Sequence, residues 1–525
     1  MKNNKWFYLG IFIFFFFYFS FSMNIFWDTG HYMSFVSIFE GDLPWRSWDI
    51  VRGPVFPLII FVSNLIFGKT TQGILFLSFV FYLIMLLVAN NILKECLKKE
   101  KQKIKKTIFI IVNGIIIINP IIFGYYHALL TEFIAITISL LMSYLSWKWI
   151  DINFFDNRKK YLVYNLIFFI GTILSWHLKQ PYVSITLFPL IISTIISIFE
   201  NRNLKNITVR ILTAIICIVS LSLSIIGWNQ FLISKNINMN TERNVTASFG
   251  KQLIIGLNNY ELVEKIDDEE IQKNKYLTDK EINQLIKKSK KYVLVNINNI
   301  SGKTIDQTII QKNKLGNITT TTAIKFILTQ LLEHPILVLE SYTSNYLAIA
   351  NLYPKQTNDN VSYWIDKDLT LDYCHENCSI ATNIYMEKSN IAYMPEESYN
   401  RVINYEQYND APVIFRYLLK ILAPISEILY KLTMILLPVI TIAATTSRIR
   451  KNNYNKKTLN LIIILLWYSL LHILVHVATG ANIDRYASPT YITALLGIII
   501  YTYIIVKNVK LTRNRSDKYE KRIRK

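Results

Sequence analysis

Residues 27–57 read WDTGHYMSFVSIFEGDLPWRSWDIVRGPVFP and place the first carboxylate of the chain directly after an apolar run. The run, Trp6 to Met23, holds no charged residue and is long enough to cross a bilayer. Asp28 is therefore expected where a helix leaves the hydrocarbon, with His31 and Tyr32 close behind it. Ionised groups at that depth are costly unless they have partners or a function, so Asp28 is a candidate functional residue. An interfacial cap or turn residue is the alternative.

The composition is that of an integral membrane protein. Hydrophobic residues make up 52% of the 525 residues and charged residues only 18%, which excludes an ordinary soluble globule. The formal net charge of +21 comes largely from short connectors between apolar segments. That distribution is typical of cytoplasmic loops next to anionic lipid, so we expect a bilayer and no nucleic acid as partner.

Ten apolar segments are expected to span the membrane. They cover about residues 6–23, 71–93, 107–123, 128–149, 161–176, 182–199, 207–233, 428–444, 459–479 and 486–506. The apolar segment 54–67 is placed along the outer interface instead. If it also crossed, the lysine-rich segment 94–106 would lie outside, against the positive-inside rule.

The predicted fold class is an all-α polytopic membrane protein with about ten transmembrane helices and a mainly helical or mixed outer soluble domain. Residues 1–233 form an N-terminal membrane module of seven helices, with a catalytic first outer loop at 24–70. Residues 234–412 form the extracytoplasmic domain, too long for a connector. Residues 413–506 supply the C-terminal membrane helices, and 507–525 form a basic cytoplasmic tail. The protein is expected in the cell membrane with both termini cytoplasmic.

Polar residues gather at the predicted outer ends of the spans. They are Asp28, His31, Tyr32, Arg46, Asp49, Arg52, His127, Glu132, His177, Lys179, Asp484 and Arg485. No comparable cluster marks the predicted inner ends. Acids and bases that meet at one depth, from segments far apart in sequence, are what an active site at the mouth of a helical bundle requires.

Three charged residues of this set carry the prediction. Glu132 is expected about one turn inside the span that begins near residue 128, where a carboxylate is expensive unless it has a function or a hydrogen-bonded neighbour. Lys179 lies at a helix end, where a lysine can snorkel, but a lone outer lysine opposes the positive-inside bias and a bound anion would explain it. Arg485 opens the last span in the same way, or forms a solvated ion pair with Asp484.

Metal and nucleotide chemistry have weaker signals. His472 and His476 share one helix face at a spacing that can hold a metal, but no third ligand is evident and we expect them to serve bundle packing. Cys374, His375 and Cys378 could bind zinc, although a short-range disulfide or free thiols are favoured outside the membrane. The sequence holds no phosphate-binding Gly-rich loop or Walker motif, which argues against nucleotide chemistry.

Several motifs occur in a fixed order. They are Asp28-X3-Tyr32, Gly41, Pro44, Arg52-Gly-Pro54-X2-Pro57, Phe67-Gly68 before a span, Thr131-Glu132 early in the fourth span, Lys179 before Pro181, and Arg485-Tyr486 with Pro489 at the last span. This ordered set resembles the GT-C superfamily of membrane glycosyltransferases, which includes the protein O-mannosyltransferases and the aminoarabinose transferase of lipid A. The resemblance covers most of the membrane part and leaves the outer domain unaligned. Thr29 follows Asp28 where several relatives carry a second acid, which argues against the mannosyltransferase branch and a metal bridged by an acid pair.

The resemblance implies an inverting enzyme that takes a sugar from a polyprenyl-phosphate carrier at the outer face. The acceptor would be a glycan, a lipid or a protein. Asp28 would be the general base, Glu132 would position substrate or a metal, and Lys179 with Arg485 would bind the lipid phosphate. The remaining predicted substrate-binding residues are His31, Tyr32, Arg52, His127 and Tyr486. The cofactor prediction stays open between none and a divalent metal.

Other functions compete with this interpretation. A lipid-linked sugar flippase or transporter would more often show internal repeats and broken helices, and no convincing repeat is found. A polysaccharide polymerase or ligase would use a polyprenyl-diphosphate donor, and the early acid Asp28 favours the first reading. A structural membrane protein would leave Asp28, Glu132 and Lys179 unexplained. Residues 321–354 are expected over the membrane mouth, with tyrosines that fill a small core or stack on sugars.

Overall fold

The computed structural model describes residues 5–21, 23, 27–48, 52–200, 204–237, 250, 253, 256–257, 320–352, 412–450, 455–479 and 484–523. This part of the chain is helical and contains no strand. Its helices begin with α1 (Lys5–Phe19), α2 (Trp27–Glu40), η1 (Trp45–Ser47), α3 (Val55–Phe67), α4 (Thr71–Cys96), α5 (Gln102–Ile117), α6 (Pro120–Tyr126) and α7 (Glu132–Ile150). They continue with α8 (Arg158–Leu178), η2 (Gln180–Val183), α9 (Ser184–Glu200), α10 (Leu204–Ser234), α16 (Thr320–Glu333), α17 (Pro335–Ile349), α21 (Val413–Ile449), α22 (Lys456–Ala478), η4 (Asp484–Ala487) and α23 (Ser488–Ile523).

Eight helices of the described part are long and apolar enough to cross a membrane: α4, α7, α8, α9, α10, α21, α22 and α23. They coincide with eight of the ten predicted spans, so the prediction of a helical, multi-pass membrane protein is confirmed at this level. The predicted span 107–123 is a pair, α5 and α6, bent by 57°. The first predicted span is α1, a helix of 15 residues. A second bent pair, α16 and α17, meets at 117° within residues assigned above to the outer domain.

The break between α5 and α6 has a local cause. Pro120 has no backbone N–H to donate, and its ring disfavours a continuing helix. The side chain of Asn119 instead caps α6, because its Oδ1 accepts hydrogen bonds from the amides of Ile121 (3.0 Å) and Ile122 (3.2 Å). Its Nδ2 donates to the Tyr491 hydroxyl of α23 at 3.1 Å. The polar break is therefore satisfied inside the bundle.

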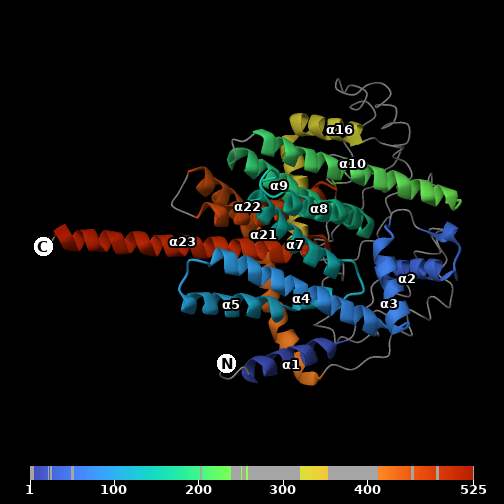
Figure 1. Cartoon of the computed structure of the whole chain (residues 1–525), viewed down its shortest axis with the longest axis horizontal. Helices are drawn as coiled ribbons and strands as arrows, with labels where there is room; N and C mark the ends of the chain where they lie inside the picture. The colour runs from blue at the N-terminus through green and yellow to red at the C-terminus, as the bar shows by residue number, and fades with distance from the viewer. Residues whose placement is uncertain are drawn as a thin grey trace.

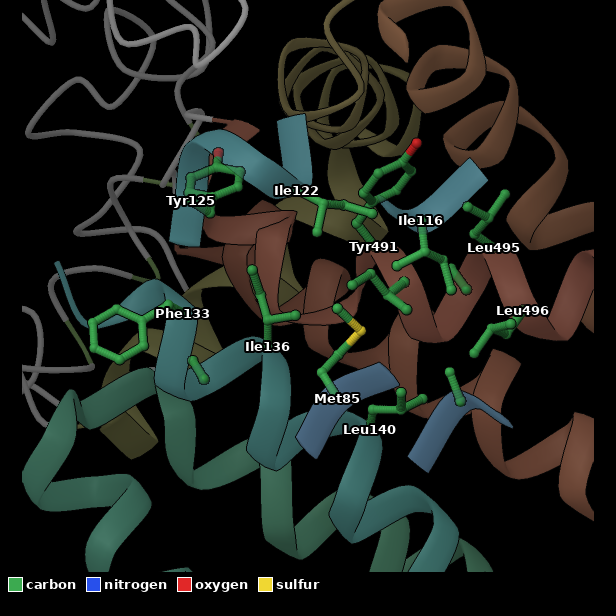
Figure 2. Packing of buried hydrophobic residues seen from close by; sticks show 14 of the residues in the cluster. Met85, Ile116, Ile122, Tyr125, Phe133, Ile136, Leu140, Tyr491, Leu495 and Leu496 are labelled. Carbon is green, nitrogen blue, oxygen red and sulfur yellow. The ribbon is translucent and has the colours of Figure 1, made fainter. Parts of the chain in front are cut away.

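Helix α7 lies at the centre of the bundle and contacts α4, α9, α22 and α23. Figure 2 shows the packing around it: Ile136 and Leu140 of α7 lie among side chains from α4, α5, α6 and α23. Small polar residues of α7 are buried here too, and Ser139 is hydrogen-bonded to Tyr468 of α22 at 2.8 Å. Such contacts let membrane helices approach closely without unsatisfied polar groups. Helix α10, by contrast, exposes large aliphatic side chains along its length, as a lipid-facing helix does.

Ion pairs join the helix ends that carry the basic connectors. These pairs are Lys148–Glu95 (2.6 Å), Lys457–Asp151 (2.9 Å), Arg448–Glu200 (2.6 Å) and Lys507–Glu100. They link the ends of α4, α7, α9, α21 and α22 and the middle of α23, so we name this side of the bundle the basic end. The C-terminal part of α23 extends away from it, and α2 and α3 lie at the opposite side (Figure 1). We name that opposite side, where α7 begins and α8 and α22 end, the site end.

Candidate functional site

Glu132 is the first residue of α7. The prediction that it lies about one turn inside a span beginning near residue 128 is wrong, because residues 128–131 form a buried turn before the helix. The position suits a carboxylate, since the N-terminus of a helix carries a partial positive charge. The Thr131 hydroxyl also donates to Glu132 Oε2 at 3.3 Å. Glu132 is 1% exposed and is thus a buried acid held at the site end.

Lys179 follows the last residue of α8 and reaches the same point. Its Nζ lies 3.2 Å from Glu132 Oε1, and its side chain is 16% exposed. Its backbone is extended, and Pro181 lies at the start of η2, so α8 cannot simply continue into α9. The turn directs the lysine toward α7. A cation and a carboxylate from α8 and α7 therefore meet where little water reaches them.

Two tyrosine rings surround the ammonium group. Lys179 Nζ lies 4.7 Å from the ring centroid of Tyr486 in η4 and 5.4 Å from that of Tyr182 in η2. Both distances fall within the range of cation–π attraction, which is stronger when the cation is desolvated. These rings add a third and a fourth element to the site. The prediction placed Tyr486 among the substrate-binding residues but did not include Tyr182.

Two histidines of α22 hold Tyr486 in place. His476 stacks on the Tyr486 ring with centroids 4.9 Å apart. His472 Nε2 lies 3.0 Å from the Tyr486 carbonyl oxygen, and His472 Nδ1 lies 2.6 Å from the Ser184 hydroxyl oxygen. His472 thus serves packing, as expected for this pair. The sequence indicates this placement in two ways. The two histidines are four residues apart near the end of a span, and the Arg485-Tyr486 motif follows in the next connector.

The segment predicted as the first outer loop touches the same end of the bundle through Tyr32, Arg52 and Gly53. Tyr32 is buried against Phe56, and the Arg52 guanidinium lies 5.3 Å from the Tyr32 ring. Gly53 packs so tightly that an added Cβ would lie 1.8 Å from the carbonyl oxygen of His177, two residues before Lys179. Only glycine fits there. The Arg-Gly-Pro sequence is therefore explained by a close approach of this loop to the end of α8.

Asp28 lies in the first turn of α2. Its neighbour Thr29 donates a hydrogen bond to the carbonyl oxygen of Leu129 at 3.0 Å, three residues before Glu132. This bond fixes the start of α2 to the turn that precedes α7. The side chains of Asp28, His31 and Arg485 lie outside the described part, so their predicted roles are untested by geometry.

His127 is placed differently from the other predicted residues. It is buried between α1 and α6, where Nδ1 lies 2.9 Å from the carbonyl oxygen of Phe123 and Nε2 lies 3.0 Å from that of Tyr18. Both ring nitrogens face backbone carbonyl oxygens, and the neutral ring donates to one of them. A substrate-binding role would require these contacts to break, and a structural role accounts for the residue without that requirement.

The described residues contain no group of three or more His, Cys, Asp and Glu side chains arranged to hold a metal ion. Cys374, His375 and Cys378 lie outside the described residues. Where α7, the end of α8, η2 and η4 meet, the structure brings together the Lys179 ammonium group, the Glu132 carboxylate and the rings of Tyr182 and Tyr486 in a poorly hydrated setting. Such a set suits an anionic ligand with an attached ring, such as a sugar phosphate.

No protein-family model matches the chain, and no curated protein and no solved structure matches it either.

Proposed function

We propose that this protein is a membrane glycosyltransferase of the GT-C type. It moves a sugar from a polyprenyl-phosphate donor to a glycan, lipid or protein acceptor at the extracytoplasmic face. The observation that carries the proposal is the buried Lys179–Glu132 pair at the site end, flanked by Tyr182 and Tyr486. Among the ion pairs of the described residues, those at the basic end and the Lys69–Glu40 and Lys431–Glu427 pairs each include a side chain more exposed than Lys179, which supports a separate role for this buried pair.

The orientation follows from the basic end. The ion pairs join residues next to the basic connectors, among them Glu95, Asp151, Glu200 and Arg448, on one side of the bundle, and positively charged connectors favour the cytoplasmic side. The site end then faces outward. A lipid-linked sugar in the outer leaflet would meet Lys179 and Tyr486 at the level where its phosphate leaves the hydrocarbon.

The chemistry assigns one task to each charged group. Asp28 takes the proton of the acceptor hydroxyl or amine as that atom forms a bond to the anomeric carbon. The bond from the anomeric carbon to the phosphate oxygen breaks, and polyprenyl phosphate leaves. Lys179 stabilises the negative charge that grows on the phosphate, and Glu132 orients the ammonium group before the donor binds. Attack from the face opposite the leaving group inverts the anomeric carbon.

The test is transfer by the purified protein in nanodiscs from a panel of radiolabelled polyprenyl-phosphate sugars. Asp28→Asn should abolish turnover while the protein stays inserted and folded, since it removes a charge and almost no volume. Lys179→Met should weaken donor binding. Lys148→Met is the matched control. Glu132, the partner of Lys179, begins α7, and Lys148 forms an ion pair with Glu95 at the other end of that helix. Equal loss of donor binding in both lysine variants would contradict the assignment.

A second function, transport of a lipid-linked sugar, is favoured by one observation. Two helix pairs in the described part, α5–α6 and α16–α17, are sharply bent, and broken helices are common in transporters. The same experiment separates the two. Donor binding without transfer or hydrolysis under any condition would favour transport, whereas turnover that depends on Asp28 favours the enzyme.

A further inference from the structure

Helix α17 is attached to the bundle at a point where α21 has a defect. Pro438 lies inside α21 and has no N–H for the carbonyl oxygen of Met434 four residues earlier. The Tyr346 hydroxyl of α17 donates to that oxygen at 2.6 Å. Met434 lies in the middle of a helix that qualifies as a membrane span. The contact therefore places α17 at the depth of the bilayer.

Two further bonds repeat this pattern. Asn345 donates from Nδ2 to the carbonyl oxygen of Val477, at the end of the span α22, at 3.0 Å. The Tyr430 hydroxyl of α21 donates to the carbonyl oxygen of Ile349 at 2.8 Å. Ile349 and the next residue also belong to the main hydrophobic core. Helix α17 is thus built into the membrane bundle across its site end, beside α22 and η4.

Helix α16 exposes most of its large aliphatic residues. Its buried side includes the polar residues Thr322, Thr329 and Gln330 as well as Ala323 and Phe326, and Thr320, Thr321 and Glu333 are exposed. Its outer side carries large aliphatic residues, among them Leu328 (52% exposed) and Leu332 (71% exposed). The apolar surface continues past the bend at Pro335 onto α17; its members are Ile324, Leu328, Leu331, Leu332, Ile336 and Leu339. A helix in water turns polar residues outward, whereas a helix in lipid does the opposite.

We infer that α16 and the first turns of α17 form a membrane-embedded hairpin whose apolar outer surface contacts lipid acyl chains of the leaflet at the site end. Three observations agree on that occupant: the hydrogen bonds to Met434 and Val477, which lie in helices long and apolar enough to span a membrane, the outward aliphatic side chains, and the composition of the pair, which together is also long and apolar enough for a span. The 117° bend keeps the pair from crossing as one straight helix. Figure 1 shows α16 at the edge of the described part.

The inference changes what surrounds the site end. The segment was expected within a soluble outer domain, and on this proposal part of it lies in the bilayer instead. Its polar inner side faces the bundle, and its end next to η4 brings hydrocarbon close to the Tyr486 segment. This holds whether the protein transfers, transports or only binds its ligand, so it does not depend on the proposed function.

The test is depth-dependent fluorescence quenching of the full chain. A background with all four cysteines replaced by serine receives single cysteines at Leu328 or Leu332, labelled with bimane. Vesicles of phosphatidylcholine and phosphatidylglycerol contain brominated phosphatidylcholine, and iodide is the aqueous quencher. Leu212→Cys on the exposed side of α10 is the lipid-facing control, and Lys159→Cys at the basic end is the water-facing control.

Both hairpin positions should lose the same fraction of fluorescence to brominated lipid as Leu212→Cys, and as little to iodide. Quenching by iodide at the level of Lys159→Cys would overturn the proposal, because the surface would then face water. Protection from both quenchers would overturn it as well, since another part of the chain or a second copy would then cover the hairpin. Because the replaced leucines are exposed, either variant is expected to fold.

Discussion

Removing one partner of the Glu132–Lys179 pair should damage the fold more than removing both. The two groups are 3.2 Å apart, and the carboxylate is 1% and the lysine 16% exposed. Lys179→Met removes the cation 3.2 Å from the carboxylate, Glu132→Gln replaces the carboxylate beside the ammonium group with a neutral amide, and the double variant removes both charges of the pair. The three variants differ little in volume, so the comparison isolates charge.

The magnitude follows from the distance and the burial. Two unit charges 3.2 Å apart attract by about 5 kcal/mol at an effective dielectric constant near 20, and desolvation offsets much of that gain. Losing one partner of a buried pair lowers the free energy of unfolding by about 3–5 kcal/mol. Lys179→Met should lie near the upper value because the remaining carboxylate is almost fully buried, and Glu132→Gln near the lower one. The double variant should stay within about 1 kcal/mol of the wild type.

The assay is reversible unfolding in mixed micelles with increasing dodecyl sulfate, followed by circular dichroism, for the wild type and the three variants. The Lys148–Glu95 pair is the control cycle, and its coupling should be at most about 1 kcal/mol because both side chains are about one third exposed. If the double variant at Glu132 and Lys179 loses the sum of the two single losses, the residues are not coupled. The account of a buried pair would then be refuted.

Three other perturbations have defined outcomes. Tyr346→Phe should lower the free energy of unfolding by about 1 kcal/mol because it leaves the Met434 carbonyl unsatisfied, and Pro438→Ala in the same chain should restore most of it by supplying an amide; unfolding in mixed micelles checks both. The Arg210 guanidinium caps the end of α7, because it donates to Ser197 and to the carbonyl oxygens of Trp149, Ile150 and Ile152. Arg210→Lys should lower the melting temperature in detergent, since one ammonium group cannot replace these bonds, and an unchanged melting temperature would contradict the cap. Gly53→Ala should reduce both expression of folded protein and donor binding, because its Cβ would collide with the His177 backbone, whereas Gly114→Ala, with open space around it, should not.

The spans could be read from the sequence because the bilayer acts on each segment separately. A segment of about 20 apolar residues must bury its backbone polar groups in a helix wherever its neighbours lie, and basic connectors report their side through charge alone. Eight predicted spans therefore coincide with helices of the structure. The sequence Asn119-Pro120 also indicates a helix start, since an N-cap residue precedes a proline. The continuous apolar run around it nevertheless predicts one unbroken span.

The hairpin of α16 and α17 escaped the sequence reading for a different reason. The pair is apolar enough for a membrane span, but it lies within the long polar stretch 234–412, and the 117° bend divides it into two helices that are each too short to cross alone. In the structure, several of its polar groups face inward: Asn345 binds the Val477 carbonyl and Thr329 bonds within its own helix. Which side of a helix meets lipid depends on its neighbours, and those are not encoded in local composition.

The candidate site divides in the same way. The sequence by itself determined which charged residues stand at span ends, since hydropathy and charge bias alone single out Glu132 and Lys179. Only the tertiary structure decided that the two meet at 3.2 Å beneath Tyr486, and that His127 is instead tied to backbone carbonyls. The physical reason is the sequence separation of the interacting residues. Whether a segment spans the bilayer depends on its own composition, whereas an ion pair between residues 47 positions apart forms only after the helices have packed.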